Sequence, residues 1–132
     1  MNNKGAMGDR TNKTIGRLGE AVAGKYLISK GYVVLDRNFT TPFGEIDLIT
    51  QQNDMTVFFE VKTRTSDRFG SPLLGITAAK QKSMIKNSLY YLKINGLCET
   101  PSRIDVIAVN LDESGRLKML EHVRNALEIE DW

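Results

Sequence analysis

The residues best suited to chemistry lie between Gly44 and Arg64, in the segment GEIDLITQQNDMTVFFEVKTR. This segment reads as two strands joined by a polar turn, with Asp47 on the first strand and Glu60 and Lys62 on the second. Apolar residues flank these charges, so both strands should be substantially covered. Taking a carboxylate out of water costs several kcal/mol unless the group is paired or binds a metal. The segment therefore carries either a compensated ion cluster or a metal site with a basic residue beside it.

Side chains alternate between the two faces of a strand, and this alternation groups the residues of the predicted hairpin. One face should carry Glu45, Asp47 and Ile49 on the first strand, and Phe58, Glu60 and Lys62 on the second. The opposite face should carry Ile46 and Leu48 on the first strand, and Val57, Phe59 and Val61 on the second. Each strand thus keeps its charged side chains on one face.

The composition is that of one soluble globular domain. The chain has 132 residues, of which 41% are hydrophobic and 26% charged, and this length is enough to bury a core. The single Cys98 excludes an intramolecular disulfide framework and agrees with a reducing compartment. The sequence shows no signal-peptide region and no apolar run of membrane-spanning length. We therefore expect a cytoplasmic protein that does not contact a membrane.

Charge is unevenly distributed along the chain. Residues 1–96 carry 14 basic and 8 acidic side chains, a net charge of +6, whereas residues 97–132 carry 4 and 8, a net charge of −4. The two parts sum to the +2 of the whole chain. A positive face with a separate acidic end is compatible with binding to a phosphate backbone, and equally with ordinary surface variation.

The first elements should form a helix followed by an antiparallel meander. Residues 1–13 lack apolar periodicity and are expected to be a flexible segment ahead of a single domain spanning residues 14–132. A helix is predicted over 14–30, with Glu20 at the border of its apolar stripe. The stripe consists of Ile15, Leu18, Val22 and Tyr26. A strand over 32–38 should then pair with the hairpin.

The later elements should complete the sheet. A helix is predicted over 77–95, and the apolar strand 103–110 should lie parallel to a meander strand through a crossover. A last strand over 117–122 and a short helical segment from Asn125 follow. The apolar stripe of the second helix consists of Ala78, Ile85, Leu89 and Leu92. This helix has no acidic residue, and its ridge of Lys82, Lys86 and Lys93, with Tyr90 between, is either a solvated face or a phosphate contact.

An Asp on the second strand and Glu-X-Lys on the third, in the order α-β-β-β-α-β, resemble the PD-(D/E)XK nuclease superfamily. The resemblance extends from Ile15 to the end of the 103–110 strand. Within the superfamily the chain is similar to the YraN-like bacterial family, uncharacterised in function, which looks most like archaeal Holliday-junction resolvases. The residues that carry it are Gly16-Arg17-Leu18-Gly19-Glu20, Gly44-Glu45-Ile46-Asp47-Leu48-Ile49 and Phe58-Phe59-Glu60-Val61-Lys62-Thr63-Arg64.

The resemblance implies a restriction-endonuclease-like fold of mixed α/β class, with a mixed sheet flanked by two helices and a C-terminal strand. It implies that Asp47, Glu60 and the backbone carbonyl of Val61 coordinate Mg²⁺ or Mn²⁺. Lys62 would position or activate the attacking water, and Glu20 would complete the metal or water shell. Hard oxygen ligands of this kind suit magnesium. The residues expected to contact nucleic acid are Arg64, Arg68, Lys82, Lys86 and Lys93.

Two features of the sequence qualify this comparison. Glu45 lies on the same strand face as Asp47, so it could substitute for that residue or support it. Gln81 is followed four residues later by Ile85, not by the Tyr of the exonuclease branch, which argues against a processive exonuclease more than against an endonuclease. His122 and Cys98 lie away from the hairpin and are interpreted as structural.

Three functional hypotheses remain open at this point. The first is a metal-dependent DNA endonuclease, either general or structure-specific, in DNA repair or recombination. Cleavage of a junction would imply a homodimer because two strands are cut symmetrically. The second is a nucleic-acid-binding protein on the same fold without turnover. The third is an interaction protein in which Asp47, Glu60, Lys62 and Arg103 form an internal ion network.

Overall fold

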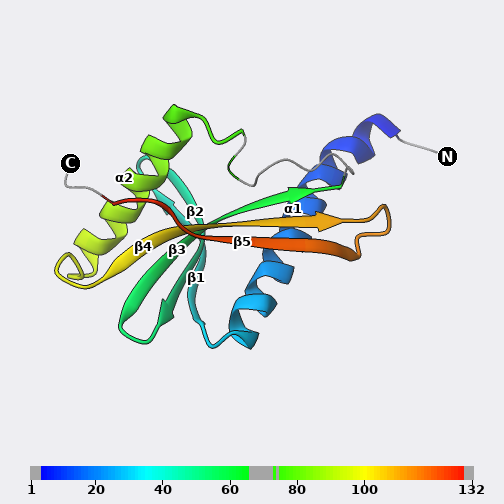
Figure 1. Ribbon diagram of the computed structural model, residues 1–132. Coiled ribbons are helices and arrows are strands. Elements are labelled where there is room, and N and C mark those ends of the chain that lie inside the picture. Colours follow the sequence, from blue (N-terminus) through cyan, green and yellow to red (C-terminus); the bar gives the residue numbers. More distant parts are fainter. Residues whose placement is uncertain (1–3, 66–72, 74, 130–132) are drawn as a thin grey trace.

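The computed structural model describes residues 4–65, 73 and 75–129, with the backbone alone described for residues 4–12. The elements are α1 (Lys4–Ser29), β1 (Val33–Thr41), β2 (Gly44–Gln52), β3 (Met55–Arg64), α2 (Ala78–Ile94), β4 (Ser102–Leu111) and β5 (Leu117–Leu127). Figure 1 shows one twisted sheet with the two helices beside it, and the strand order is β1-β2-β3-β4-β5. The predicted element order and the mixed sheet are confirmed.

The sheet combines an antiparallel meander with one parallel pair. β1, β2 and β3 are antiparallel neighbours, β3 and β4 are parallel, and β5 is antiparallel to β4. The α2 crossover is what allows β4 to run parallel to β3. β4 is buried along the eight residues 104–111, as expected for a strand covered on both faces. These features confirm the predicted topology.

The two helices cover opposite faces of the sheet and define two apolar clusters. Ala23 and Leu27 of α1 pack in one cluster with Leu48, Val57 and Phe59 among others. The α2 cluster consists of Ile46, Ile49, Phe58, Met84, Leu92, Ile104 and Val106. Adjacent residues of β3 thus alternate between the clusters, as predicted.

On β2 the predicted alternation is wrong at one position. Ile46 packs on the α2 side with Ile49, whereas Leu48 packs on the α1 side. The break falls at Asp47, across from Asn38 of β1, whose φ of 51° departs from the extended conformation. The strand is therefore locally irregular at Asp47.

The pairing of β2 with β3 stops just before the two acidic residues. Their ladder runs from the pair Gln52–Met55 to the pair Leu48–Phe59. Beyond it, β2 continues beside β1 as far as Gly44, while β3 continues beside β4 as far as Arg64. The two strands therefore diverge beyond the Leu48–Phe59 pair, and we call this point of divergence the β2–β3 fork. Asp47 and Glu60 are the first residues past the last pair.

Helix α1 is longer than predicted. It includes residues 4–13, so the helix start expected at Thr14 is wrong. No proline occurs before Pro42, and nothing in this polar segment sterically ends a helix. The mobility expected for this segment stays a prediction. Leu18, expected in the apolar stripe, is 40% exposed, and among residues 13–29 of α1 the fully buried apolar side chains are those of Ala23 and Leu27.

Gly19 sets the approach of α1 to the sheet. A methyl group at Gly19 would overlap the side chain of Thr63 on β3, so only glycine allows this contact. Gly16, one turn earlier, faces open space. The close approach falls one residue before Glu20 and three residues after Glu60, which brings α1 to the arms of the fork.

Helix α2 buries a more polar face than predicted. Thr77 caps its N-terminus by accepting a hydrogen bond from the Lys80 backbone N–H. The buried α2 residues are Met84, Asn87, Ser88 and Leu92, of which only Leu92 belongs to the predicted stripe. Ala78 of that stripe is exposed. The buried Asn87 accepts a hydrogen bond from the Thr41 hydroxyl and donates one to the Glu45 carbonyl at 3.4 Å, which ties α2 to β1 and β2.

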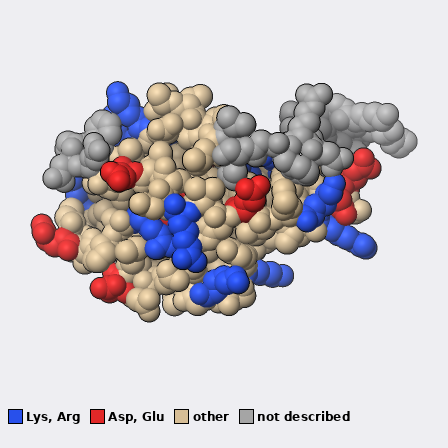
Figure 2. All heavy atoms as spheres, in the orientation of Figure 1, with Lys and Arg blue, Asp and Glu red and all other residues tan. Residues whose placement is uncertain are grey.

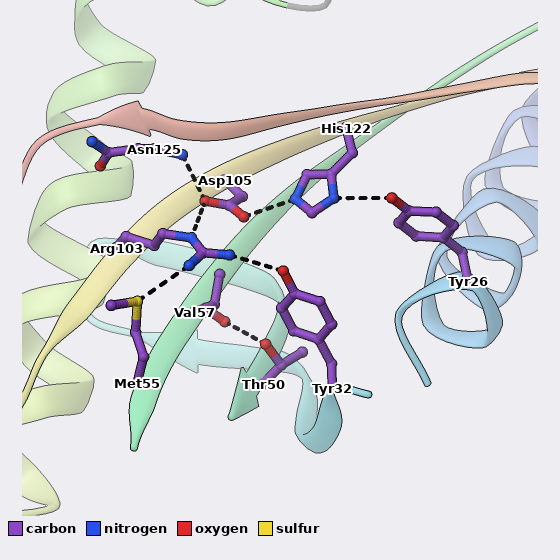
Figure 3. A network of polar contacts seen from close by, with 9 residues as sticks. All are labelled: Tyr26, Tyr32, Thr50, Met55, Val57, Arg103, Asp105, His122 and Asn125. Carbon is purple, nitrogen blue, oxygen red and sulfur yellow. Dashed lines mark hydrogen bonds and ion pairs between the residues drawn. The ribbon is translucent and has the colours of Figure 1, made fainter. Parts of the chain in front are cut away.

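A buried polar network joins β4 and β5 to the α1 side of the molecule (Figure 3). Asp105 is fully buried and accepts hydrogen bonds from Arg103 Nε at 2.9 Å and from the Asn125 backbone N–H at 2.8 Å. His122 Nε2 lies 2.8 Å from Asp105, and its Nδ1 lies 3.2 Å from the Tyr26 hydroxyl. The structural role predicted for His122 agrees with these contacts.

The C-terminal prediction is wrong in one respect. The expected helical segment from Asn125 does not form, because β5 continues to Leu127. Asn125 has a φ of 51°, and the register of β4 and β5 shifts beside it, so the strand accommodates the residue as a bulge. In the part of the chain that the structure describes, no helix is long and apolar enough to cross a membrane.

Candidate active site

The fork between β2 and β3 holds a pair of carboxylates. The backbone N–H of Val61, which lies past the end of the β2–β3 ladder, donates a hydrogen bond to Asp47 Oδ2 at 2.8 Å. Glu60 in turn accepts a hydrogen bond from the Asp47 carboxyl. The Asp47 side chain therefore joins β2 to β3 where no backbone pair does so, and this side chain can also carry charge.

The electrostatics of Asp47 are unusual for a carboxyl group. Burial, the charge of Glu60 and, more weakly, the charge of Glu20 raise the pKa of Asp47 from 3.8 to about 7, against the opposing hydrogen bond from Val61. Burial likewise raises the pKa of Glu60. The charged forms of both carboxyl groups are therefore disfavoured, because burial outweighs the positive charge near them.

Lysine side chains supply part of that positive charge. Lys80, in the first turn of α2, lies 3.5 Å from Glu60 Oε2, and its charge and hydrogen bond lower the pKa of Glu60 against the larger effect of burial. Lys62 also lowers the pKa of Glu60 through its charge. Gly75, before α2, lies against Lys62, since a methyl group there would come within 3.1 Å of Lys62 Nζ. Both lysines thus border the pair of carboxylates.

The structure brings together most of the residues expected at the catalytic centre. Asp47, Glu60 and Lys62 meet at the fork, and Glu20 is near enough for its charge to act on Asp47. The N–H group of Val61 contacts Asp47, and metal binding by the Val61 carbonyl stays a prediction. Arg103, placed in the ion network of the third hypothesis, pairs with Asp105 instead.

Of the five residues expected to contact nucleic acid, one lies on β3 and three lie on α2. Arg64 ends β3, and the side chains of Lys82, Lys86 and Lys93 are exposed on α2. Arg68 lies outside the described residues. On the face of the molecule seen in Figure 2, Lys and Arg side chains occupy several separate places with Asp and Glu among them. Although α2 itself contains no acidic residue, this face of the molecule does not show one continuous basic surface.

Sequence reasoning missed Lys80, although a signal for it existed. Lys80, Met84, Asn87 and Tyr91 are spaced as one stripe of a helix, and Met84 and Asn87 are buried against the sheet. A lysine at the N-terminal end of that stripe must lie over the sheet, whereas Lys82 and Lys86 face away. If the buried stripe of α2 had been identified from the sequence, Lys80 would have been predicted as the α2 residue at the site.

The donor set suits a hard divalent cation. Asp47 and Glu60 offer carboxylate oxygens, and both have raised pKa values that a nearby cation would counteract. Magnesium requires only one or two carboxylates when waters and substrate phosphates complete its shell. Among residues 4–65, 73 and 75–129, no group of three His, Cys, Asp or Glu side chains is placed to hold a metal ion. The site therefore offers two carboxylate ligands, and Glu20 acts on Asp47 through its charge.

Comparison with known proteins matches the segment that contains this site. A model of the uncharacterised protein family UPF0102 matches residues 19–109. A UPF0102 protein of Thermodesulfovibrio yellowstonii is 45% identical over 112 residues, covering 85% of this chain and 94% of that protein. A UPF0102 protein of Clostridioides difficile is 42% identical over 115 residues, covering 87% and 97%. Among solved structures, SfsA of Pyrococcus furiosus in complex with Ca²⁺ is 14% identical with a TM-score of 0.42, covering 89% of this chain and 65% of that one.

Proposed function

We propose that the chain, which belongs to the uncharacterised protein family UPF0102, is a divalent-metal-dependent DNA endonuclease with its active site at the β2–β3 fork. The observation that carries the proposal is the Asp47–Glu60 pair. Two half-buried carboxyl groups that are hydrogen-bonded to each other, and whose charged forms are disfavoured, are costly for the fold. Such an arrangement is typical of a site that binds a cation together with an anionic substrate.

Each side chain at the fork has a distinct role in this proposal. Asp47 and Glu60 would hold Mg²⁺ or Mn²⁺, with Asp47 oriented by the Val61 N–H group. When bound, the cation would polarise the phosphodiester and lower the pKa of a coordinated water. Lys62 would orient the attacking water and stabilise the negative charge that develops on the phosphoryl oxygens. Glu20 would bind water at the edge of the metal shell.

Lys80 is a positioning residue in this scheme. Its ammonium group lies 3.5 Å from Glu60, and its side chain is 43% exposed, so it can turn toward a phosphate when a cation takes its place at Glu60. Before the cation binds, Lys80 lowers the pKa of Glu60 and so favours its ionised form. Lys80 would therefore exchange one anionic partner for another during substrate binding.

Nucleic-acid binding without turnover is the second candidate function, and the Lys80–Glu60 ion pair favours it. This contact already compensates one of the two carboxylates from within the protein. In that case the exposed lysines of α2 would bind phosphates, and the fork would serve only to hold β2, β3 and α2 together.

A cleavage assay separates these two functions. Duplex, single-stranded, flap and four-way-junction DNA would be incubated with Mg²⁺, Mn²⁺ or EDTA and the wild-type protein. We expect cleavage that requires the metal, is lost in Asp47→Ala, and falls about 10²–10³-fold in Lys62→Ala, the range for removing a donor that stabilises transition-state charge. Lys25→Ala, on the exposed side of α1, is the matched lysine control and should cleave normally.

Failure of the folded wild-type protein to cut any of these substrates would support binding without turnover. Cleavage that survives in Asp47→Ala would place the active site elsewhere. The preferred substrate would also decide the oligomeric state to look for, since symmetric cutting of a four-way junction requires two copies of the site.

A further inference from the structure

A compact aromatic and basic surface lies next to α2 at the turn between β1 and β2. Phe43 in this turn is 50% exposed, and its ring centroid lies 6.4 Å from that of Tyr90, with an angle of 79° between the ring planes. Lys86 Nζ lies 5.5 Å from the centre of the Phe43 ring. Leu89 and Lys93 complete a shallow pocket with these three residues. We call these five residues the Phe43–Tyr90 surface.

The backbone of Phe43 is held firmly although its ring is exposed. Its N–H group donates to the Thr41 hydroxyl oxygen at 3.0 Å, and its carbonyl accepts a hydrogen bond from Ser83 of α2 at 2.9 Å. Thr41 is in turn hydrogen-bonded to the buried Asn87. Hydrogen bonds thus join the turn to α2 both at Thr41 and at the Phe43 carbonyl. A large apolar ring presented to solvent on a fixed backbone is a preorganised contact.

The distance from this surface to the carboxylate pair is short enough to be spanned by a few nucleotides of one strand. Phe43 precedes Asp47 by four residues, or roughly 13 Å at the rise of a strand. Lys86 follows Lys80 by six residues, or roughly 9 Å along a helix. A single nucleic-acid strand bound at the fork can therefore reach the Phe43–Tyr90 surface without a second binding domain.

The charge of the surface selects the kind of partner. Lys86 and Lys93 are exposed, and α2 contains no acidic residue. Aromatic rings beside lysines on a positive helix are the combination that binds single-stranded nucleic acid, where bases stack on rings and phosphates contact the ammonium groups. A base in a duplex offers no free face for such stacking, because its neighbours already cover it.

We propose that the Phe43–Tyr90 surface stacks an unpaired base of the DNA strand bound at the fork. Lys86 and Lys93 contact the phosphates on either side of that base. This inference rests on the proposed endonuclease function, which places the DNA strand at the fork. It adds to that function the class of substrate. The preferred substrate has unpaired nucleotides beside the scissile bond, as at a flap, a bulge or a single-stranded end.

Binding in the presence of EDTA tests this proposal without cleavage. A fluorescein-labelled oligothymidylate and a duplex of equal length are titrated with wild-type protein, Phe43→Leu and Tyr90→Leu. We expect each substitution to weaken binding of the single strand by about 5- to 150-fold, the equivalent of losing one stacked base. Binding of the duplex should stay within twofold. Leucine keeps an apolar side chain, so a loss of affinity reports stacking.

Lysine variants test the phosphate contacts. Lys86→Met and Lys93→Met should each reduce the slope of log affinity against log salt by about 0.7 for the single strand. Lys25→Met on α1 is the matched control and should leave the slope unchanged. An unchanged slope in both α2 variants would contradict the proposed phosphate contacts.

A measurement on the wild-type protein covers the case in which a variant fails to fold. An oligonucleotide containing 5-iodouracil is irradiated in the complex, and the crosslinked peptide is identified by mass spectrometry. We expect crosslinks at Phe43 or Tyr90. Crosslinks exclusively elsewhere, equal losses on duplex and single strand, or equally effective competition by polyglutamate would overturn the proposal, the last by indicating an acidic peptide as the partner.

The outcomes separate this inference from the endonuclease activity. Selective single-strand binding that depends on Phe43, without any cleavage in Mg²⁺, would support the stacking surface and contradict the nuclease. Metal-dependent cleavage with unchanged binding by Phe43→Leu would support the nuclease and contradict the stacking surface.

Discussion

At the scale of the residue, Asp47 makes the fold sensitive to pH. Its pKa is raised to about 7 by burial and by Glu60, so the folded state keeps a proton that the unfolded chain releases near pH 3.8. The stability that this proton confers is complete below about pH 4 and is lost as the pH rises through 7. Asp47→Asn removes this dependence while keeping an oxygen that can accept the Val61 hydrogen bond.

We therefore expect Asp47→Asn to increase the free energy of unfolding at pH 8 by about 1–2 kcal/mol, with a much smaller change at pH 4. Urea denaturation at both pH values measures this. Asp54→Asn, in the exposed β2–β3 turn, is the matched control and should change neither value. A loss of stability at pH 8 in Asp47→Asn would mean that the charged carboxylate holds the fork together, as in an internal ion network.

Lys80 gives a second prediction at this scale. It lowers the pKa of Glu60, and a carboxylate must be ionised to bind a metal. In Lys80→Met the pKa of Glu60 should rise, so the midpoint of the pH dependence of Mg²⁺ binding should move to higher pH. Lys80→Arg should retain the wild-type midpoint. Calorimetric titration with Mg²⁺ between pH 6 and pH 9 measures the midpoint, and no shift in Lys80→Met would exclude the positioning role.

The sequence predicts the carboxylates of the site better than it predicts their cations. Asp47, Glu60 and Lys62 stand on two consecutive strands, so hairpin pairing alone brings them together. Lys80 comes from a separate helix, and its direction depends on which face of α2 is buried. That face contains Asn87 and Ser88, which are polar, so hydrophobic periodicity points to the wrong side.

At the scale of the element, Gly19 and Gly16 offer a matched pair of substitutions on one helix. Gly19→Ala should lower the free energy of unfolding by about 1–3 kcal/mol, because its methyl group would overlap Thr63 on β3. Gly16→Ala meets open space and should raise it by roughly 0.5–1 kcal/mol through helix propensity alone. Urea denaturation of the two variants decides this, and equal effects would contradict the close packing of α1 on β3.

The packing at Gly19 also bears on the site. A displaced α1 would move Glu20 away from Asp47, so Gly19→Ala should lower the pKa of Asp47 slightly as well as the stability. Thr63→Ala in the same chain removes most of the atoms that the new methyl group would meet and should restore part of the stability. Sequence periodicity cannot predict such a contact, because it depends on the distance between two elements rather than on either one.

At the scale of the whole molecule, two buried carboxyl groups, Asp47 and Asp105, have opposite effects on how stability depends on pH. Burial alone would raise the pKa of Asp105, but hydrogen bonds from His122, Arg103 and the Asn125 N–H lower it below its ordinary value. The stability that Asp105 contributes is present above about pH 3.8 and is lost in stronger acid. Asp47 acts at the other end, between about pH 4 and pH 7.

We therefore expect the free energy of unfolding to be greatest near pH 4–5 and to decline toward pH 8. Asp105→Asn should cost about 3–5 kcal/mol at neutral pH, since it leaves Arg103 without its buried partner. Denaturation curves recorded across the pH range measure both effects. A wild-type maximum at pH 8 would contradict the raised pKa of Asp47, and a marginal effect of Asp105→Asn would show that the network of Figure 3 is replaceable.

The topology of the whole molecule was predictable because short connections leave few alternatives. Three consecutive strands with tight turns must form a meander, and a helix before an apolar strand implies a parallel crossover. The Asp105 network could not be predicted in the same way. Its members Tyr26, Arg103, His122 and Asn125 are up to 99 positions apart in the chain and meet only after the sheet and α1 are assembled.

The parallel pairing of β3 with β4 has a consequence for synthesis on the ribosome. β3 ends at Arg64, and its partner begins 38 residues later at Ser102. At translation rates of 5–20 residues per second, β3 would wait roughly 2–8 s for that partner to emerge. During this interval one edge of the apolar strand β3 stays open, because β2 covers only the other edge. The nascent chain should therefore depend on chaperones most strongly between the emergence of β3 and that of β4.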